Sequence, residues 1–87
     1  MRYLSLEEDL KKETEKWLQR AEGDLDEIIL QQAGGQRFLT NIAAYISDSR
    51  YFLERGDLIR AFEAVIWAWA WIEIGLDMGA LAQKDDS

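Results

Sequence analysis

The sequence predicts an all-α protein built as an up-and-down three-helix bundle. Apolar residues recur at three- and four-residue steps through most of the 87 residues, which is the period of a helix. There is no proline to interrupt a helix, and glycines separate the periodic segments. We expect helices at about residues 6–31, 36–55 and 58–78. They would form a single domain over residues 1–87, with a frayed tail at 80–87.

The first helix is expected to begin after Ser5. The sequence Ser5-Leu6-Glu7-Glu8 has the S-x-x-E pattern of a capping box, in which the serine and glutamate side chains each accept a hydrogen bond from the other residue's backbone. The apolar phase then continues past Gly23 without a slip. This favours one long helix over a break at Gly23, although an interior glycine costs about 1 kcal/mol relative to alanine.

Glycines mark both turns and the end of the third helix. Gly34 is expected as a left-handed cap of the first helix. At the second turn, Gly56 can adopt the same conformation while Asp57 caps the start of the next helix. So short a connection makes the second and third helices antiparallel neighbours. Gly79 is expected to end the third helix.

The third helix is the most apolar part of the chain. Between Ala61 and Ile74 only Glu63 and Glu73 are polar, and three of the four tryptophans lie in this stretch. A helix that is apolar nearly all round is buried on several sides. A membrane span needs roughly 20 apolar residues with few charges, so these two glutamates argue against one. Gly75, inside this helix, indicates a close approach of another backbone.

A bundle of this size covers one wide face of the third helix but not its whole circumference. Either Trp69 or the pair Trp67 and Trp71 is therefore expected to remain available. One alternative is that the long first helix covers both sides and leaves a single indole half exposed. We favour the other, an exposed patch that contacts a second copy or another protein, because tryptophan is enriched at interfaces. The expected interface residues are Trp67, Trp71, Ile74 and Met78.

The composition excludes several classes of function. The chain has no cysteine and no histidine, so disulfides, thiol chemistry, a histidine base and the usual zinc sites are absent. The formal charge of −7 disfavours both a nucleic-acid partner and an anionic membrane surface. The N-terminus lacks the apolar core of a secretory signal, which predicts a cytoplasmic protein.

Four polar residues are candidates for a binding site. Asp48 and Glu73 are candidate ligands of a cation such as Mg²⁺ if they face each other across the second and third helices, with Tyr45 and Asp57 nearby. The structural alternative is favoured: Asp57 is a helix cap, Asp48 and Glu63 pair with neighbouring arginines, and Glu73 bonds to a tyrosine.

The second and third helices resemble a known family at a set of spaced residues: Tyr45-x-x-Asp48, Tyr51-Phe52, Gly56-Asp57, Arg60-Ala61-Phe62, Trp67-Ala68 and Trp71-Ile72-Glu73. The family consists of small, mostly archaeal helical proteins catalogued as a domain of unknown function. The resemblance covers about residues 42–76. Three positions depart from its pattern, where Trp67, Ala70 and Glu73 replace the usual Tyr, Gly and Asp. The resemblance implies a three-helix bundle and no established activity.

We therefore expect a non-enzymatic interaction or structural module without a cofactor, most simply a homodimer formed through the third helix. The alternative is a bundle that binds a small ligand or a cation between the second and third helices.

Overall fold

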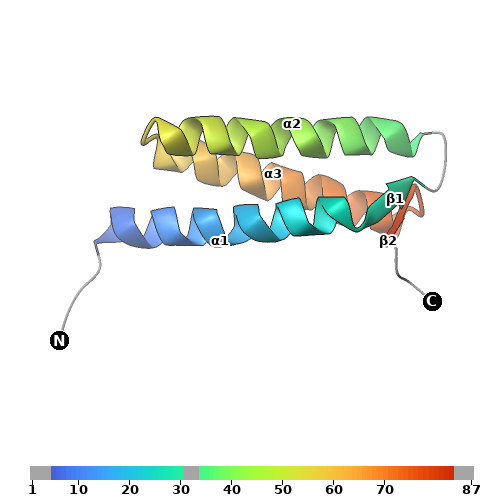
Figure 1. Ribbon diagram of the computed structural model, residues 1–87, viewed down its shortest axis with the longest axis horizontal. Coiled ribbons are helices and arrows are strands. Elements are labelled where there is room, and N and C mark those ends of the chain that lie inside the picture. The colour runs from blue at the N-terminus through green and yellow to red at the C-terminus, as the bar shows by residue number, and fades with distance from the viewer. Residues whose placement is uncertain (1–4, 31–33, 84–87) are drawn as a thin grey trace.

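The computed structural model describes residues 5–30 and 34–83, and Figure 1 shows three helices lying side by side. α1 and α3 run in one direction and α2 in the other, and α3 packs against both of the other helices. The predicted up-and-down three-helix bundle is confirmed. The elements in chain order are α1 (Leu6–Asp26), β1 (Ile28–Leu30), α2 (Gly35–Glu54), α3 (Leu58–Asp77) and β2 (Leu81–Gln83).

α1 begins with the predicted capping box. The backbone N–H of Glu8 donates to the Ser5 hydroxyl, and the backbone N–H of Ser5 donates to the Glu8 carboxylate, both at 3.0 Å. The hydrogen bond from the Ser5 backbone N–H, with a smaller contribution from the Ser5 side chain, holds the pKa of Glu8 below its usual value. The helix passes through Gly23 without a break, as predicted, but it ends at Asp26 rather than near residue 31.

The two short strands correct both ends of the prediction. β1 and β2 pair antiparallel, with Ile28 opposite Gln83 and Leu30 opposite Leu81. Residues 28–30 are therefore not helical, and the segment after α3 is not frayed as far as residue 83. Ile28, Ala80 and Leu81 are all buried, and strand pairing satisfies backbone groups that this burial removes from water. The rest of the expected frayed tail, residues 84–87, lies outside the described residues.

The turn between α2 and α3 has the predicted chemistry. Gly56 has a φ of 78°, in the left-handed region, and the Asp57 side chain accepts a hydrogen bond from the Arg60 backbone at 3.2 Å. Gly79 also has a positive φ of 76° and follows the end of α3, as expected. Gly34 is not in the left-handed region, because its φ is −68°. Because α1 ends eight residues earlier, Gly34 has no helix end to cap and instead precedes α2.

Small residues line the buried side of α3. Ala61, Ala64 and Ala68 are all buried there, and the buried Ser49 hydroxyl of α2 donates a hydrogen bond to the Ala61 carbonyl at 2.7 Å. Side chains of this size allow two helix backbones to approach closely, and the serine bond fixes their register. We call these three alanines the alanine surface of α3; Val65 and Ile72 of the same helix are also buried in the core.

Gly75 extends this small-residue surface to the end of α3, where side chains approach it. A Cβ placed there would lie 2.5 Å from Leu81 Cδ1 and 3.2 Å from Phe38 Cδ1. The predicted close approach is real, but the prediction of another backbone is wrong. The reason is the unpredicted β2, which places the buried Leu81 over the glycine.

Two tryptophans join α1 to α3. The ring centroids of Trp17 and Trp69 lie 5.7 Å apart at an interplanar angle of 86°, an edge-to-face arrangement. The Trp69 indole N–H donates to the Trp17 backbone carbonyl at 3.1 Å. Trp69 is thus the tryptophan of α3 that faces α1. This contact helps to set the rotation of α3 about its own axis, and that rotation determines which side of the helix remains uncovered.

Candidate functional site

Five large apolar side chains are exposed on α3: Ile59, Ile66, Trp67, Ile74 and Met78. We call these residues the α3 stripe. Ile59 and Met78, at its two ends, are 68% and 66% exposed, and Trp67 near its middle is 56% exposed. Isolated apolar side chains are common on protein surfaces, but a row of them along one helix marks a site of interaction.

Ile59 and Ile66 of the stripe lie opposite the alanine surface of the same helix, and Trp67, Ile74 and Met78 lie at angles between the two. Successive residues of an α-helix are rotated by about 100°, which places Ile59, Ile66 and Ala70 about half a turn away from the buried Ala61 and Ala68. The bundle thus buries the small side chains of α3 together with Val65 and Ile72, while the five side chains of the stripe stay exposed. This arrangement explains how a helix so rich in tryptophan and isoleucine belongs to a bundle of only three helices.

The structure groups three of the four predicted interface residues, since Trp67, Ile74 and Met78 all belong to the stripe. Trp71 is only half-buried against α2, where its ring lies 5.2 Å from that of Phe38 at 70°. Ile59 and Ile66 were missed by the prediction.

A sequence signal for these two residues exists. The three alanines at positions 61, 64 and 68 follow helical spacing, which indicates where a partner helix approaches closely. The isoleucines half a turn away must then face outward.

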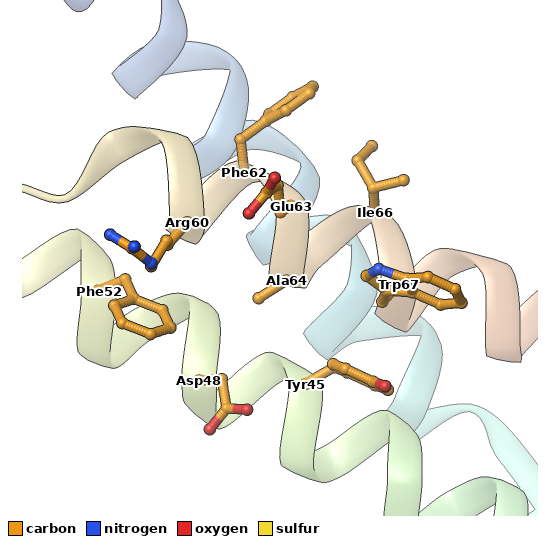
Figure 2. Close-up of a pocket in the computed structure, with 9 residues that line it drawn as sticks. All are labelled: Tyr45, Asp48, Phe52, Arg60, Phe62, Glu63, Ala64, Ile66 and Trp67. Atoms are coloured by element: carbon orange, nitrogen blue, oxygen red, sulfur yellow. The ribbon is translucent and has the colours of Figure 1, made fainter.

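Beside the stripe, α2 and α3 enclose an open groove of about 560 Å³, which we call the α2–α3 groove. Figure 2 shows that α2 and α3 both contribute side chains to it, with Ala64 between them. Ile66 and Trp67 belong to both the groove and the stripe, so the two features are continuous. The groove is lined by Tyr45, Asp48, Phe52, Arg60, Phe62, Glu63, Ala64, Ile66 and Trp67.

Aromatic rings form one end of the groove. Tyr45 of α2 and Trp67 of α3 are stacked, with centroids 6.1 Å apart and an interplanar angle of 20°. The exposed carboxylates of Asp48 and Glu63 stand on the α2 and α3 sides respectively (Figure 2). Among the described residues, neither carboxylate forms a salt bridge. This differs from the expected pairing with arginines, because Arg50 binds Glu22 of α1 and Arg60 binds Asp57 instead.

The predicted pair of cation ligands is not brought together. Asp48 lines the α2–α3 groove, whereas Glu73 lines a separate hollow with Ile74 and Asp77. The contact of Phe38 with Trp71 places the Glu73 end of α3 beside the start of α2. Ten residues of helix, or about 15 Å, separate Phe38 from Asp48. Across the described part of the chain, no three His, Cys, Asp or Glu residues are grouped to hold a metal.

Asp57 has the structural role that the sequence suggested. Its carboxylate accepts a hydrogen bond from the Arg60 side chain at 2.8 Å and one from the Arg60 backbone. These bonds, the side-chain one foremost, lower the pKa of Asp57 and raise that of Arg60. Among the described residues, no tyrosine hydroxyl donates a hydrogen bond to Glu73. Asp57 therefore stabilises the start of α3 and holds the Arg60 guanidinium.

The groove and stripe together combine apolar and acidic surface. They offer aromatic faces, aliphatic side chains and two carboxylates without ion pairs, and the chain contains no histidine or cysteine. Within residues 5–30 and 34–83, no helix has the length and apolar character required to span a bilayer.

These features define a small helical bundle with one exposed apolar helix face. The sequence matches the family model DUF357, described as a protein of unknown function, over residues 7–81, and the chain belongs to that family. The resemblance inferred from the spaced residues of α2 and α3 is thereby confirmed.

Among solved structures, the fold is similar to that of protein AF1782 from Archaeoglobus fulgidus, also titled as a DUF357 protein. The two chains share 59% sequence identity and superpose with a TM-score of 0.84, over 91% of this chain and 99% of the other. No curated protein matches the sequence.

Proposed function

We propose that this protein is a non-enzymatic interaction module that associates with a second copy of itself through the α3 stripe. The observation that carries the proposal is the exposure of five large apolar side chains on the uncovered side of α3. Burying them would remove apolar area from water, at roughly 25 cal/mol per Å².

The stripe is complementary to itself in shape. Ala70 lies near its middle and is only partly covered, with the larger Ile66 and Ile74 one helical turn away on either side. Large side chains of one copy can occupy the space over the small residue of the other, as ridges fit into grooves when helices pack. A two-fold axis, the usual symmetry of soluble dimers, brings the same face of both copies together.

The size of the stripe indicates a weak dimer. Ile59 and Met78 are separated by about 28 Å along the helix axis, and a helix is about 10 Å wide, so the face covers roughly 300 Å². Stable interfaces bury about 800 Å² on each partner. We therefore expect dissociation constants in the micromolar range or above, unless the groove residues also take part.

Charge opposes this association. Glu63, Glu73 and Asp77 lie on the same exposed side of α3, and the whole chain carries a formal charge of −7. Repulsion between two such faces is screened when salt shortens the Debye length. Apolar contact is not weakened by salt in the same way, so the dimer should become stronger as the salt concentration rises.

Sedimentation or light scattering across a dilution series tests the proposal. The expected result is a mass that rises from 10.1 kDa toward twice that value with concentration. Ile74→Glu should shift the equilibrium to monomer by placing a charge in the contact. Tyr51→Glu is the matched control because Tyr51 is 51% exposed on α2 and belongs neither to the stripe nor to the α2–α3 groove.

A monomer at all concentrations would exclude self-association. Equal dissociation by Ile74→Glu and by Tyr51→Glu would show that α3 is not the contact.

A further inference from the structure

We infer that the α2–α3 groove binds a cationic side chain, arginine or lysine, presented by a protein other than a second copy. This inference goes beyond self-association, because it assigns a ligand chemistry to the groove and not to the stripe.

The polar groups of the groove carry an excess of negative charge. Asp48 of α2 and Glu63 of α3 line it, and Arg60, the one cationic side chain among the described residues that line it, is already bound to the Asp57 carboxylate at 2.8 Å. The groove thus has two carboxylates and one guanidinium whose charge is already paired. Within the described part of the chain, these two exposed carboxylates form no ion pair, which favours the binding of a cation from another molecule. This local attraction adds to the attraction from the chain's overall negative charge.

The apolar groups of the groove suit the rest of such a side chain. The stacked rings of Tyr45 and Trp67 offer aromatic faces and edges at one end, and the face of an indole or phenol ring attracts a guanidinium or ammonium group. The floor at Ala64 accepts an aliphatic stem, since it has no large side chain to displace. A volume of about 560 Å³ is enough for one long side chain.

A bare divalent metal fits the same groove less well. Mg²⁺ requires six oxygen ligands in close to octahedral geometry, and the described residues bring no three carboxylates or other metal-binding side chains together. An organic cation needs no such arrangement, because it is bound by aromatic faces and by one or two carboxylates.

The groove is continuous with the α3 stripe, which indicates a protein as the source of the cation. Ile66 and Trp67 border both features, so a helix with apolar residues one turn from a basic residue could contact the stripe and fill the groove at once. A free amine would leave the stripe uncovered.

The experiment uses the full chain and a short amphipathic peptide with leucines at helical spacing and one central arginine. The control peptide has citrulline, which is neutral and nearly the same shape, in place of arginine. Binding is followed by NMR at the Trp67 indole N–H. We expect the arginine peptide to bind about tenfold more tightly than the citrulline peptide, with the preference reduced by salt.

Variants of the groove carboxylates complete the test. The double variant Asp48→Asn with Glu63→Gln should abolish the preference for arginine, and Glu73→Gln, on the same helix but outside the groove, should retain it. n-Butylguanidinium should shift the same indole signal more weakly than the peptide, and MgCl₂ should not shift it.

Equal binding of the two peptides, no shift at Trp67, or tighter binding of free n-butylguanidinium or Mg²⁺ than of the peptide would each overturn the inference. A failure of this inference can be distinguished from a failure of the self-association proposal. The double variant should leave the solution mass unchanged, whereas Ile74→Glu should lower the mass and retain the arginine preference.

Discussion

Replacing two glycines inside helices with alanine, one at a time, tests how closely β2 packs on α3. At Gly23 of α1, no atom of the described residues, apart from its chain neighbours and the adjacent helix backbone, lies within 4 Å of the position that an alanine Cβ would occupy, and its φ is not in the left-handed region. Replacing it with alanine should raise the free energy of unfolding by about 0.5–1 kcal/mol, because glycine loses more backbone entropy on folding.

Gly75→Ala makes the same chemical change where space is absent. The added methyl group would lie 2.5 Å from Leu81 Cδ1 and 2.9 Å from Leu81 Cγ. Leu81 is only 2% exposed and belongs to a paired strand, so it cannot easily move away. Overpacking of this kind costs about 1–3 kcal/mol. The propensity gain is common to both variants, so their stabilities should differ by about the overpacking cost.

Urea denaturation followed by circular dichroism, at one fixed protein concentration, measures this difference. Leu81→Ala, alone and combined with Gly75→Ala, provides a second test of the same contact. It should cost about 2–5 kcal/mol alone, but it should also remove the penalty of Gly75→Ala in the double variant. If Gly75→Ala stabilises as much as Gly23→Ala in the unaltered protein, the packing of β2 on α3 is refuted.

Two further predictions concern hydrogen bonds. Ser49→Ala should lower the free energy of unfolding by about 1 kcal/mol, because it removes the buried bond to the Ala61 carbonyl; the exposed Ser47→Ala in the same helix should change it by less than about 0.5 kcal/mol. The Ser5 amide lowers the pKa of Glu8, so this carboxylate stabilises the fold above its ordinary pKa of about 4.3 and loses the effect as the pH falls. The denaturation midpoints of the wild type and Glu8→Gln should therefore differ at pH 7 and converge near pH 3; a difference that persists in acid would contradict this account.

The helices were predictable because their signals are local. The capping box at Ser5, the Gly56-Asp57 turn and the apolar period each depend on residues within a few positions of one another, and all three occur as expected. The passage of α1 through Gly23 followed from the unbroken apolar phase in the same way.

The strands were not predictable from local pattern. Ile28-Ile29-Leu30 continues the apolar phase of α1, and three apolar residues are too few to distinguish the period of a strand from that of a helix. Their partner, Leu81–Gln83, follows the entire α2–α3 hairpin in the chain. Only the folded bundle brings the two segments together.

The candidate site was partly predictable for a related reason. The excess of apolar surface on α3 was evident from composition, but the exposed set depends on how α3 is rotated against α1 and α2. That rotation is determined by contacts between distant residues, such as Trp69 with Trp17 and Ser49 with Ala61. The pairing of Asp48 with Glu73 failed because it assumed a register that the contact of Phe38 with Trp71 rules out.

The β1–β2 pairing also has a consequence for the order in which the protein opens. It joins the end of α1 to the segment after α3, so it closes a loop that contains the whole α2–α3 hairpin. Closing a loop of this length has a larger entropic cost than joining α2 and α3, which only residues 55–57 separate. We therefore expect the pairing to form late in folding and to open before α2 and α3 separate. Hydrogen exchange should then be faster at the backbone amides of the β1–β2 pairing than at those in the middle of α2 and α3.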